Sequence, residues 1–107
     1  MAKRTVWIVK GEWYDIDNLG LSGSWIEGVG NSKDAALEIV QRCIKNCIEE
    51  DPIYCIFKTV PTIKEIEDAV DPIDDDLKYF YGYEERYLSI WEFPVHYKRS
   101  KRRSANG

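Results

Sequence analysis

Residues 31–50 read NSKDAALEIVQRCIKNCIEE, and this stretch decides the fold. Wound as a helix, it places its apolar side chains on one side and most of its charged side chains on the other. Asn31 or Ser32 can cap the first turn, Asp34 puts negative charge near the positive end of the helix dipole, and Pro52 stops the helix. The apolar side needs a sheet to cover it. The apolar side of the helix consists of Ala36, Leu37, Val40, Cys43, Ile44, Cys47 and Ile48.

Four other segments have the composition of strands, because β-branched and aromatic residues are enriched in them or alternate with polar ones. Two of them, residues 5–13 and 24–29, are joined by a loop of turn-forming residues, which predicts an antiparallel hairpin. The other two are residues 53–60 and 85–95. A capping box at Thr62 and Glu65 predicts a short helix over residues 63–70. We expect a loop with helical character over residues 71–83.

The assembled prediction is an α+β fold in the order β-β-α-β-α-β. It has two layers, a mostly antiparallel four-stranded sheet and one long amphipathic helix packed on one face. A right-handed crossover would place strand 53–60 parallel to strand 24–29 if both lie in this sheet. Pro94 cannot donate to a ladder, which favours an edge position for strand 85–95. We expect one domain over residues 1–97 and a mobile basic tail over residues 98–107.

The amino-acid composition indicates the cellular compartment in which we expect the protein. The chain of 107 residues has no apolar run approaching the roughly 18 residues that span a bilayer, and its start passes directly into a strand. Its three cysteines form an odd set without a disulfide framework spacing, which fits a reducing compartment. We therefore expect a cytoplasmic protein without membrane contact, located in the host-cell cytoplasm if it is encoded by a phage.

Acidic residues and tyrosines are concentrated between residues 65 and 85, where Lys78 is the single basic residue. Such a surface suits a basic protein partner, because tyrosine gives a large contact area at low rotamer cost. An acidic surface kept for solubility, with the aromatic rings covering a sheet face, remains the alternative. The predicted partner-binding residues are Glu65, Glu67, Asp68, Asp71, Asp74, Asp75, Asp76, Tyr79, Tyr81, Tyr83, Glu84 and Glu85.

The leading functional hypothesis is a non-enzymatic protein-binding protein, inhibitory or mimicking nucleic acid, with no catalytic residue, metal or cofactor. One alternative uses the basic tail, in which five positive side chains within six residues could bind the phosphates of nucleic acid. Those residues are Lys98, Arg99, Lys101, Arg102 and Arg103. The other alternative is a small metal- or thiol-dependent protein that uses Cys43, Cys47, Cys55 and His96.

The stretch WIEGVGNSKDAA, residues 25–36, resembles the strand–turn–helix of many small phage and bacterial proteins, in which a Ser-Lys-x-x-Ala opening starts a helix. The resemblance covers about a tenth of the chain and names no family. It implies an accessory protein of a mobile element and carries over no catalytic residues.

Overall fold

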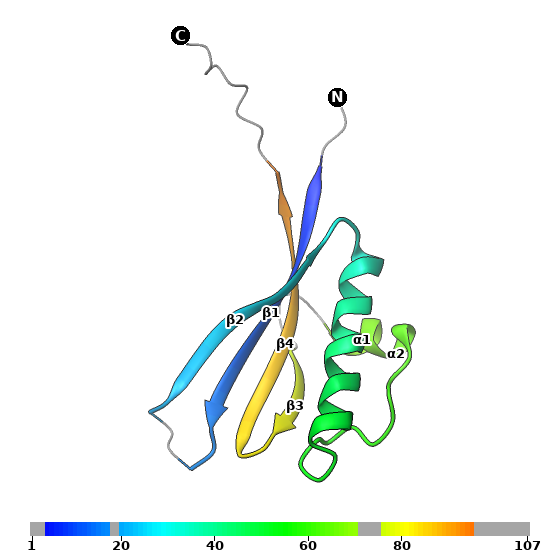
Figure 1. Cartoon of the computed structure of the whole chain (residues 1–107). Helices are drawn as coiled ribbons and strands as arrows, with labels where there is room; N and C mark the ends of the chain where they lie inside the picture. Colours follow the sequence, from blue (N-terminus) through cyan, green and yellow to red (C-terminus); the bar gives the residue numbers. More distant parts are fainter. Residues whose placement is uncertain (1–3, 18–19, 71–75, 96–107) are drawn as a thin grey trace.

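The computed structural model describes residues 4–17, 20–70 and 76–95 of the chain. Its elements are β1 (Thr5–Asp15), β2 (Ser22–Gly30), α1 (Lys33–Glu50), α2 (Ile63–Ala69), β3 (Leu77–Tyr81) and β4 (Glu84–Pro94). The four strands form one sheet in the order β2-β1-β4-β3, and every neighbouring pair is antiparallel. Both helices lie on the same side of this sheet (Figure 1). The predicted α+β class, the four-stranded antiparallel sheet and the long helix on one face are confirmed.

Helix α1 forms where the periodicity predicts it. Ser32 is the N-cap, and its hydroxyl accepts a hydrogen bond from the backbone N–H of Ala35 at 3.1 Å. The predicted apolar side faces the sheet, since Ala36, Leu37, Val40, Ile44 and Cys47 are all buried. The capping box of α2 is also confirmed: the Glu65 N–H donates to Thr62 Oγ1 at 3.1 Å, and the Thr62 N–H donates to Glu65 Oε1 at 2.8 Å.

The predicted strand over residues 53–60 is wrong. The segment turns back on itself after α1, with the Cys55 N–H donating to the Asp51 carbonyl at 3.0 Å. Cys55 is buried, whereas Ile53 and Ile56 are 80% and 47% exposed, so the apparent alternation does not produce an apolar face. The element order is therefore β-β-α-α-β-β, and no strand in the described residues is parallel to β2.

The fourth strand of the sheet is β3, within a segment for which we expected a loop with helical character. Tyr79, Phe80 and Tyr81 favour a strand, and Gly82 adopts φ +61°, which permits the tight connection to β4. The Gly82 N–H also donates to the carboxylate of Asp51. Because β3 pairs with β4, the edge position expected for β4 is wrong, and β4 lies between β1 and β3.

The two faces of the sheet differ in what covers them. Val9, Leu88 and Ile90 point toward α1 and join its buried side chains in the core. The next residues along each strand point the other way, because side chains alternate between faces. In the register Ile8 is opposite Trp91, and Glu12 is opposite Tyr87. No described element covers this second face, which we call the open face (Figure 1).

No helix in the described part of the chain is both long and apolar enough to cross a membrane.

Candidate functional site

The predicted acidic residues do not form one surface. Glu65, Glu67 and Asp68 belong to α2 on the helix side, whereas Asp76 and Glu85 border the open face. Several are paired with basic residues of the chain itself. These pairs join Glu67 to Lys33 at 3.1 Å, Asp68 to Lys64 at 3.7 Å, Glu85 to Lys78 at 2.8 Å and Glu84 to Arg86 at 2.7 Å. Asp71, Asp74 and Asp75 lie outside the described residues.

The predicted tyrosines have different environments. Tyr79 is 1% exposed and belongs to the core, so it is not available on the surface. The Tyr81 hydroxyl donates to the carboxylate of Glu50 at the end of α1. Tyr83 is 65% exposed at the turn between β3 and β4, and its ring lies 5.5 Å from that of Tyr54. These three rings therefore do not share a face with Asp76 and Glu85.

Acidic residues and tyrosines do meet on the open face, in a hollow of about 390 Å³ that we call the acidic hollow. Tyr14 and Tyr87 form one part of its wall, with ring centroids 5.7 Å apart in an edge-to-face arrangement of 77°. Three carboxylates complete it. The lining residues are Glu12, Tyr14, Asp76, Glu85 and Tyr87.

Two lysines form ion pairs with carboxylates of the acidic hollow. Lys78 pairs with Glu85, and this hydrogen bond raises the pKa of Lys78. Lys10 lies 3.8 Å from Glu12. The four side chains in these two pairs are between 31% and 43% exposed, and ion pairs at such exposure contribute little to folding stability. These two ion pairs therefore contribute little to the stability of the fold.

Two of the five residues of the acidic hollow, Asp76 and Glu85, were among those predicted. Glu12, Tyr14 and Tyr87 were missed, because they belong to strands that we had interpreted only as structural elements. The alternation of side chains along each strand could have indicated these residues. Glu12 and Tyr14 are two residues apart on β1 and share a face, and Tyr87 is opposite Glu12 on β4. Finding them required the β1–β4 pairing, which the sequence does not indicate.

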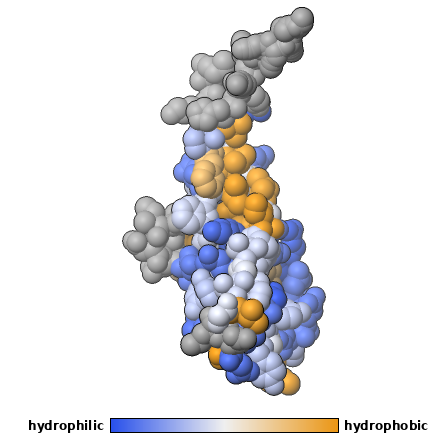
Figure 2. Space-filling model, turned by 90° about the vertical axis from the view of Figure 1, so that its left-hand side faces the viewer, coloured by the Kyte–Doolittle hydropathy of each residue, from blue (hydrophilic) through white to orange (hydrophobic). Residues whose placement is uncertain are grey.

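The other end of the open face is apolar, and we call it the apolar end: Ile8, Ile26, Val29, Trp91 and Phe93. Ile26 is 63% exposed, Val29 56% and Phe93 46%. Figure 2 shows hydrophobic side chains grouped along the upper part of this face, whereas hydrophilic residues dominate below it. Singly exposed apolar residues are normal on a protein surface, whereas a contiguous group of this kind is uncommon there.

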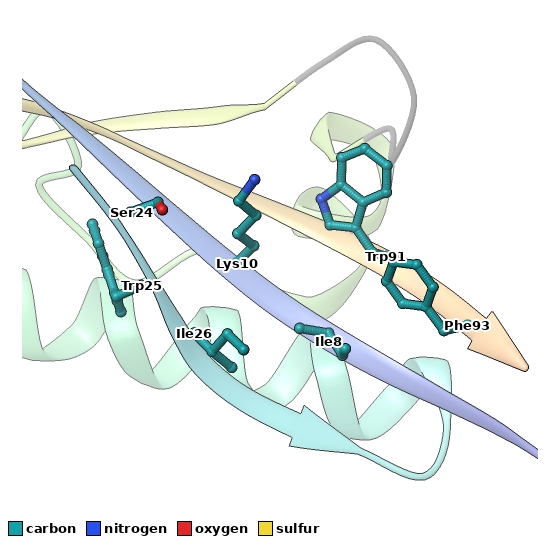
Figure 3. Close-up of a pocket in the computed structure, with 7 residues that line it drawn as sticks. All are labelled: Ile8, Lys10, Ser24, Trp25, Ile26, Trp91 and Phe93. Carbon is teal, nitrogen blue, oxygen red and sulfur yellow. The ribbon is translucent and has the colours of Figure 1, made fainter. Parts of the chain in front are cut away.

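A groove of about 480 Å³ runs through the apolar end (Figure 3). Trp91 and Phe93 project from β4 on one side of it, with their rings stacked at a centroid distance of 6.4 Å. Ile26 projects from β2 on the other side, and Ile8 lies on β1 between them. Lys10 is at the boundary with the acidic hollow. The remaining lining residues are Ser24 and Trp25.

Arg86, on the helix side of the sheet, is used inside the fold. Its guanidinium lies 4.6 Å from the centroid of the Tyr81 ring and 5.3 Å from that of Trp25. Partial burial lowers the pKa of Arg86, but hydrogen bonds to Glu84 and Tyr79 outweigh this effect and raise it. Arg86 on β4 therefore links this strand to Tyr81 on β3 and to Trp25 on β2 within the fold.

The cysteines have the environment of core residues. Cys47 and Cys55 are buried, and the Cys47 thiol donates to the Phe80 carbonyl at 2.9 Å. Burial raises the pKa of Cys43 to about 11 and that of Cys47 to about 12. A thiolate nucleophile needs the opposite shift. Among the described residues no three His, Cys, Asp or Glu side chains are grouped to hold a metal ion, and His96 lies outside them.

We expect iodoacetamide to label Cys43 in the native protein at pH 8 about 100-fold more slowly than an unperturbed thiol, because the reactive thiolate is correspondingly rare. Mass spectrometry of the alkylated protein over time measures the rate. The same protein in denaturant is the control and should be labelled rapidly at all three cysteines. Rapid labelling of native Cys43 or Cys47 would instead support the thiol-dependent alternative.

The predicted nucleic-acid-binding residues Lys98, Arg99, Lys101, Arg102 and Arg103 lie outside the described residues, so the use of the tail stays a prediction.

Comparisons with protein-family models, with curated proteins and with solved structures found no match to this chain.

Proposed function

We propose that this protein is a non-enzymatic protein-binding module whose acidic hollow receives a lysine or arginine side chain from a basic partner surface. The observation that supports this proposal is the meeting of three carboxylates and two tyrosine rings around one hollow of about 390 Å³. The segment 65–85 proposed from the sequence contributes Asp76 and Glu85, and β1 and β4 contribute the rest.

The chemistry of the acidic hollow fits a cationic side chain. Carboxylates attract and hydrogen-bond an ammonium or guanidinium group, and aromatic rings attract the same cation through their π faces. Lys10 and Lys78 of the chain itself lie beside Glu12 and Glu85, and a cation of the partner would take their place. A phosphate-bearing ligand is disfavoured at the same place by repulsion from the carboxylates.

Basic protein surfaces that bind nucleic acid present many such cations. Inhibition of a nucleic-acid-binding protein by mimicry therefore belongs to this proposal, and it agrees with an accessory role in a mobile element. The exposed apolar end beside the acidic hollow adds the kind of surface on which hydrophobic contacts form at protein interfaces.

The test is affinity capture from the source organism followed by binding measurements with the purified partner. We expect the double variant Glu12→Gln/Glu85→Gln to bind at least about 10-fold more weakly, since loss of each cation contact costs on the order of 1 kcal/mol. Binding by the wild type should weaken steeply between low and high salt. Tyr87→Ala should weaken binding without altering the salt dependence.

The matched control is Glu38→Gln/Glu49→Gln, which removes the same charge from exposed positions on α1. This variant should bind like the wild type, because α1 lies on the opposite side of the sheet from the acidic hollow. Equal affinity of both double variants would refute a role for the acidic hollow and leave only a general effect of net charge.

A further inference from the structure

Strand β2 forms one border of the sheet, and no other strand in the described part of the chain pairs with its outer edge (Figure 1). Border strands in natural proteins are commonly protected against further pairing by lysine, by proline or by their short length. The other border strand, β3, has five residues and carries Lys78. β2 has nine residues, no proline and one charged side chain, that of Glu27. The outer edge of β2 therefore lacks these protections.

This outer edge presents regularly spaced backbone groups. At the start of the β1–β2 pairing, the Asp15 N–H donates to the Leu21 carbonyl at 3.1 Å, so the backbone groups of Leu21 point toward β1. Such groups alternate in direction along an antiparallel strand, and those of Ser22, Ser24 and Ile26 therefore point outward. A bulge in the register with β1 follows Ile26 and ends the regular stretch.

On the open face, the side chains of this stretch are small at one end and apolar at the other. Ser22 and Ser24 are exposed and lie opposite Tyr14 and Glu12, two residues of the acidic hollow. Ile26 is 63% exposed and projects from β2 at the apolar end (Figure 3). Because neighbouring strands are about 4.8 Å apart, a strand added outside β2 would lie roughly 9.6 Å from β1. Long cationic side chains of that strand can cross the two serines and reach the acidic hollow.

We propose that the basic partner is bound through an extended segment that adds to the outer edge of β2 as a fifth, antiparallel strand of the sheet. This inference rests on the proposed function and specifies the form in which the partner presents its cations. Read from its N-terminus, the added strand places an apolar residue beside Ile26, a lysine or arginine beside Ser24 and a second one beside Ser22. The predicted recognition motif is therefore apolar-x-basic-x-basic, where x is any residue.

The backbone of the added strand supplies affinity, and its alternate side chains supply specificity. Each of the three outward-pointing residues of β2 offers one N–H and one carbonyl to a neighbouring strand. The apolar residue of the motif packs beside Ile26, and aliphatic pairs on neighbouring strands stabilise a sheet. The two basic residues lie toward Glu12 and Tyr14, where carboxylates and aromatic rings attract them.

The probe is a synthetic peptide with this motif, acetyl-Thr-Val-Thr-Arg-Thr-Arg-Thr-amide. NMR titration of the full, isotope-labelled chain measures its dissociation constant, and hydrogen exchange measures the protection of each backbone amide. We expect saturating peptide to slow exchange at Ser24 and Ile26 by at least about 10-fold, because both amides become hydrogen-bonded. The amides of Gly23 and Trp25 already point toward β1 and should change little.

Two methylated peptides test the added strand without changing the protein. In the proposed arrangement the backbone N–H groups of the valine and of both arginines face β2, whereas those of the threonines face away. Methylation of the first arginine's backbone nitrogen should weaken binding by at least about 10-fold, since it removes a hydrogen bond and places a methyl group between the strands. Methylation of the threonine nitrogen between the arginines is the matched control and should leave the affinity nearly unchanged.

The reversed peptide, acetyl-Thr-Arg-Thr-Arg-Thr-Val-Thr-amide, tests the direction of the added strand. It has the same composition and charge, but an antiparallel fit would place an arginine beside Ile26 and the valine beside Ser22. We therefore expect it to bind more weakly than the first peptide. Tighter binding by the reversed peptide would overturn the antiparallel arrangement.

The remaining outcomes separate this inference from the proposed function. Weaker peptide binding by Glu12→Gln/Glu85→Gln, together with equal binding of both methylated peptides, would overturn the added strand and leave the acidic hollow as a site for cations. No peptide binding up to about 1 mM would overturn the added strand as well. Selective loss with the methylated arginine would support it. If Glu12→Gln/Glu85→Gln then bound the peptide like the wild type, the proposed role of the acidic hollow would be refuted instead.

Discussion

Replacement of Tyr79 by alanine is expected to lower the free energy of unfolding by about 3–5 kcal/mol, which is the range for truncating a large buried aromatic side chain. Tyr79 is 1% exposed and is the largest of the fully buried side chains. Its hydroxyl lies 3.7 Å from the Cys43 sulfur, and it also interacts with Arg86. Chemical denaturation monitored by circular dichroism measures the loss.

Tyr79→Phe separates the ring from the hydroxyl. It keeps the packed ring and removes only the polar contacts, so we expect a cost of about 0.5–1.5 kcal/mol. Neither variant should change the contacts of the acidic hollow directly, and Tyr79→Phe should therefore bind a basic partner like the wild type. A stable Tyr79→Ala protein with lost partner binding would reverse this assignment and restore Tyr79 as a surface residue.

Gly11→Ala is expected to destabilise the protein by about 1–3 kcal/mol through overpacking. In most strands this substitution is favourable by roughly 0.5–1 kcal/mol, because glycine loses more backbone freedom on folding. Here the indole of Trp25 covers the glycine from the neighbouring strand, and an added Cβ would lie 2.3 Å from Trp25 Cζ2. The indole is also held by Glu27, which accepts its N–H at 2.7 Å. A loss of stability, where Gly→Ala in a strand usually gives a gain, would therefore show that Trp25 packs on Gly11.

Gly28→Ala on β2 is the comparison for Gly11→Ala. An added Cβ there would lie 3.0 Å from Ile39 Cδ1 and 3.2 Å from Ile39 Cγ2, both farther than the 2.3 Å at Gly11, so a smaller shift relieves the contact. Its cost should be smaller than that of Gly11→Ala in the same denaturation experiment. If Gly11→Ala were as stable as the wild type, Trp25 would not be packed over Gly11.

The parts of the fold that depend on local sequence could be predicted. The β1–β2 hairpin has strong strand formers around turn residues, and α1 has a complete amphipathic period with its own cap. The capping box of α2 is likewise contained within four residues. In each case the interactions that stabilise the element join residues close together in the chain, so a single sequence contains the relevant information.

The errors come from elements that depend on distant pairing. Residues 53–60 alternate like a strand, but the fourth place in the sheet is taken by β3, which pairs with β4. The five residues of β3 are too few to show a clear period and follow a run of acids. They become a strand because Gly82 lets them pair with β4. The acidic hollow was only partly predicted for the same reason, since the β1–β4 register brings Glu12 and Tyr87 together.

The position of β4 in the sheet has a consequence for biosynthesis. The longest strand pairing joins β1 to β4, from Thr5 opposite Pro94 to Asp15 opposite Glu84. A nascent chain that has emerged only as far as α2 can form the first hairpin and both helices, but the core side of β1 and α1 still lacks Leu88 and Ile90. Folding on the ribosome therefore cannot be completed before β4 has left the exit tunnel, and until then the incomplete sheet exposes a strand edge and apolar surface that chaperones recognise.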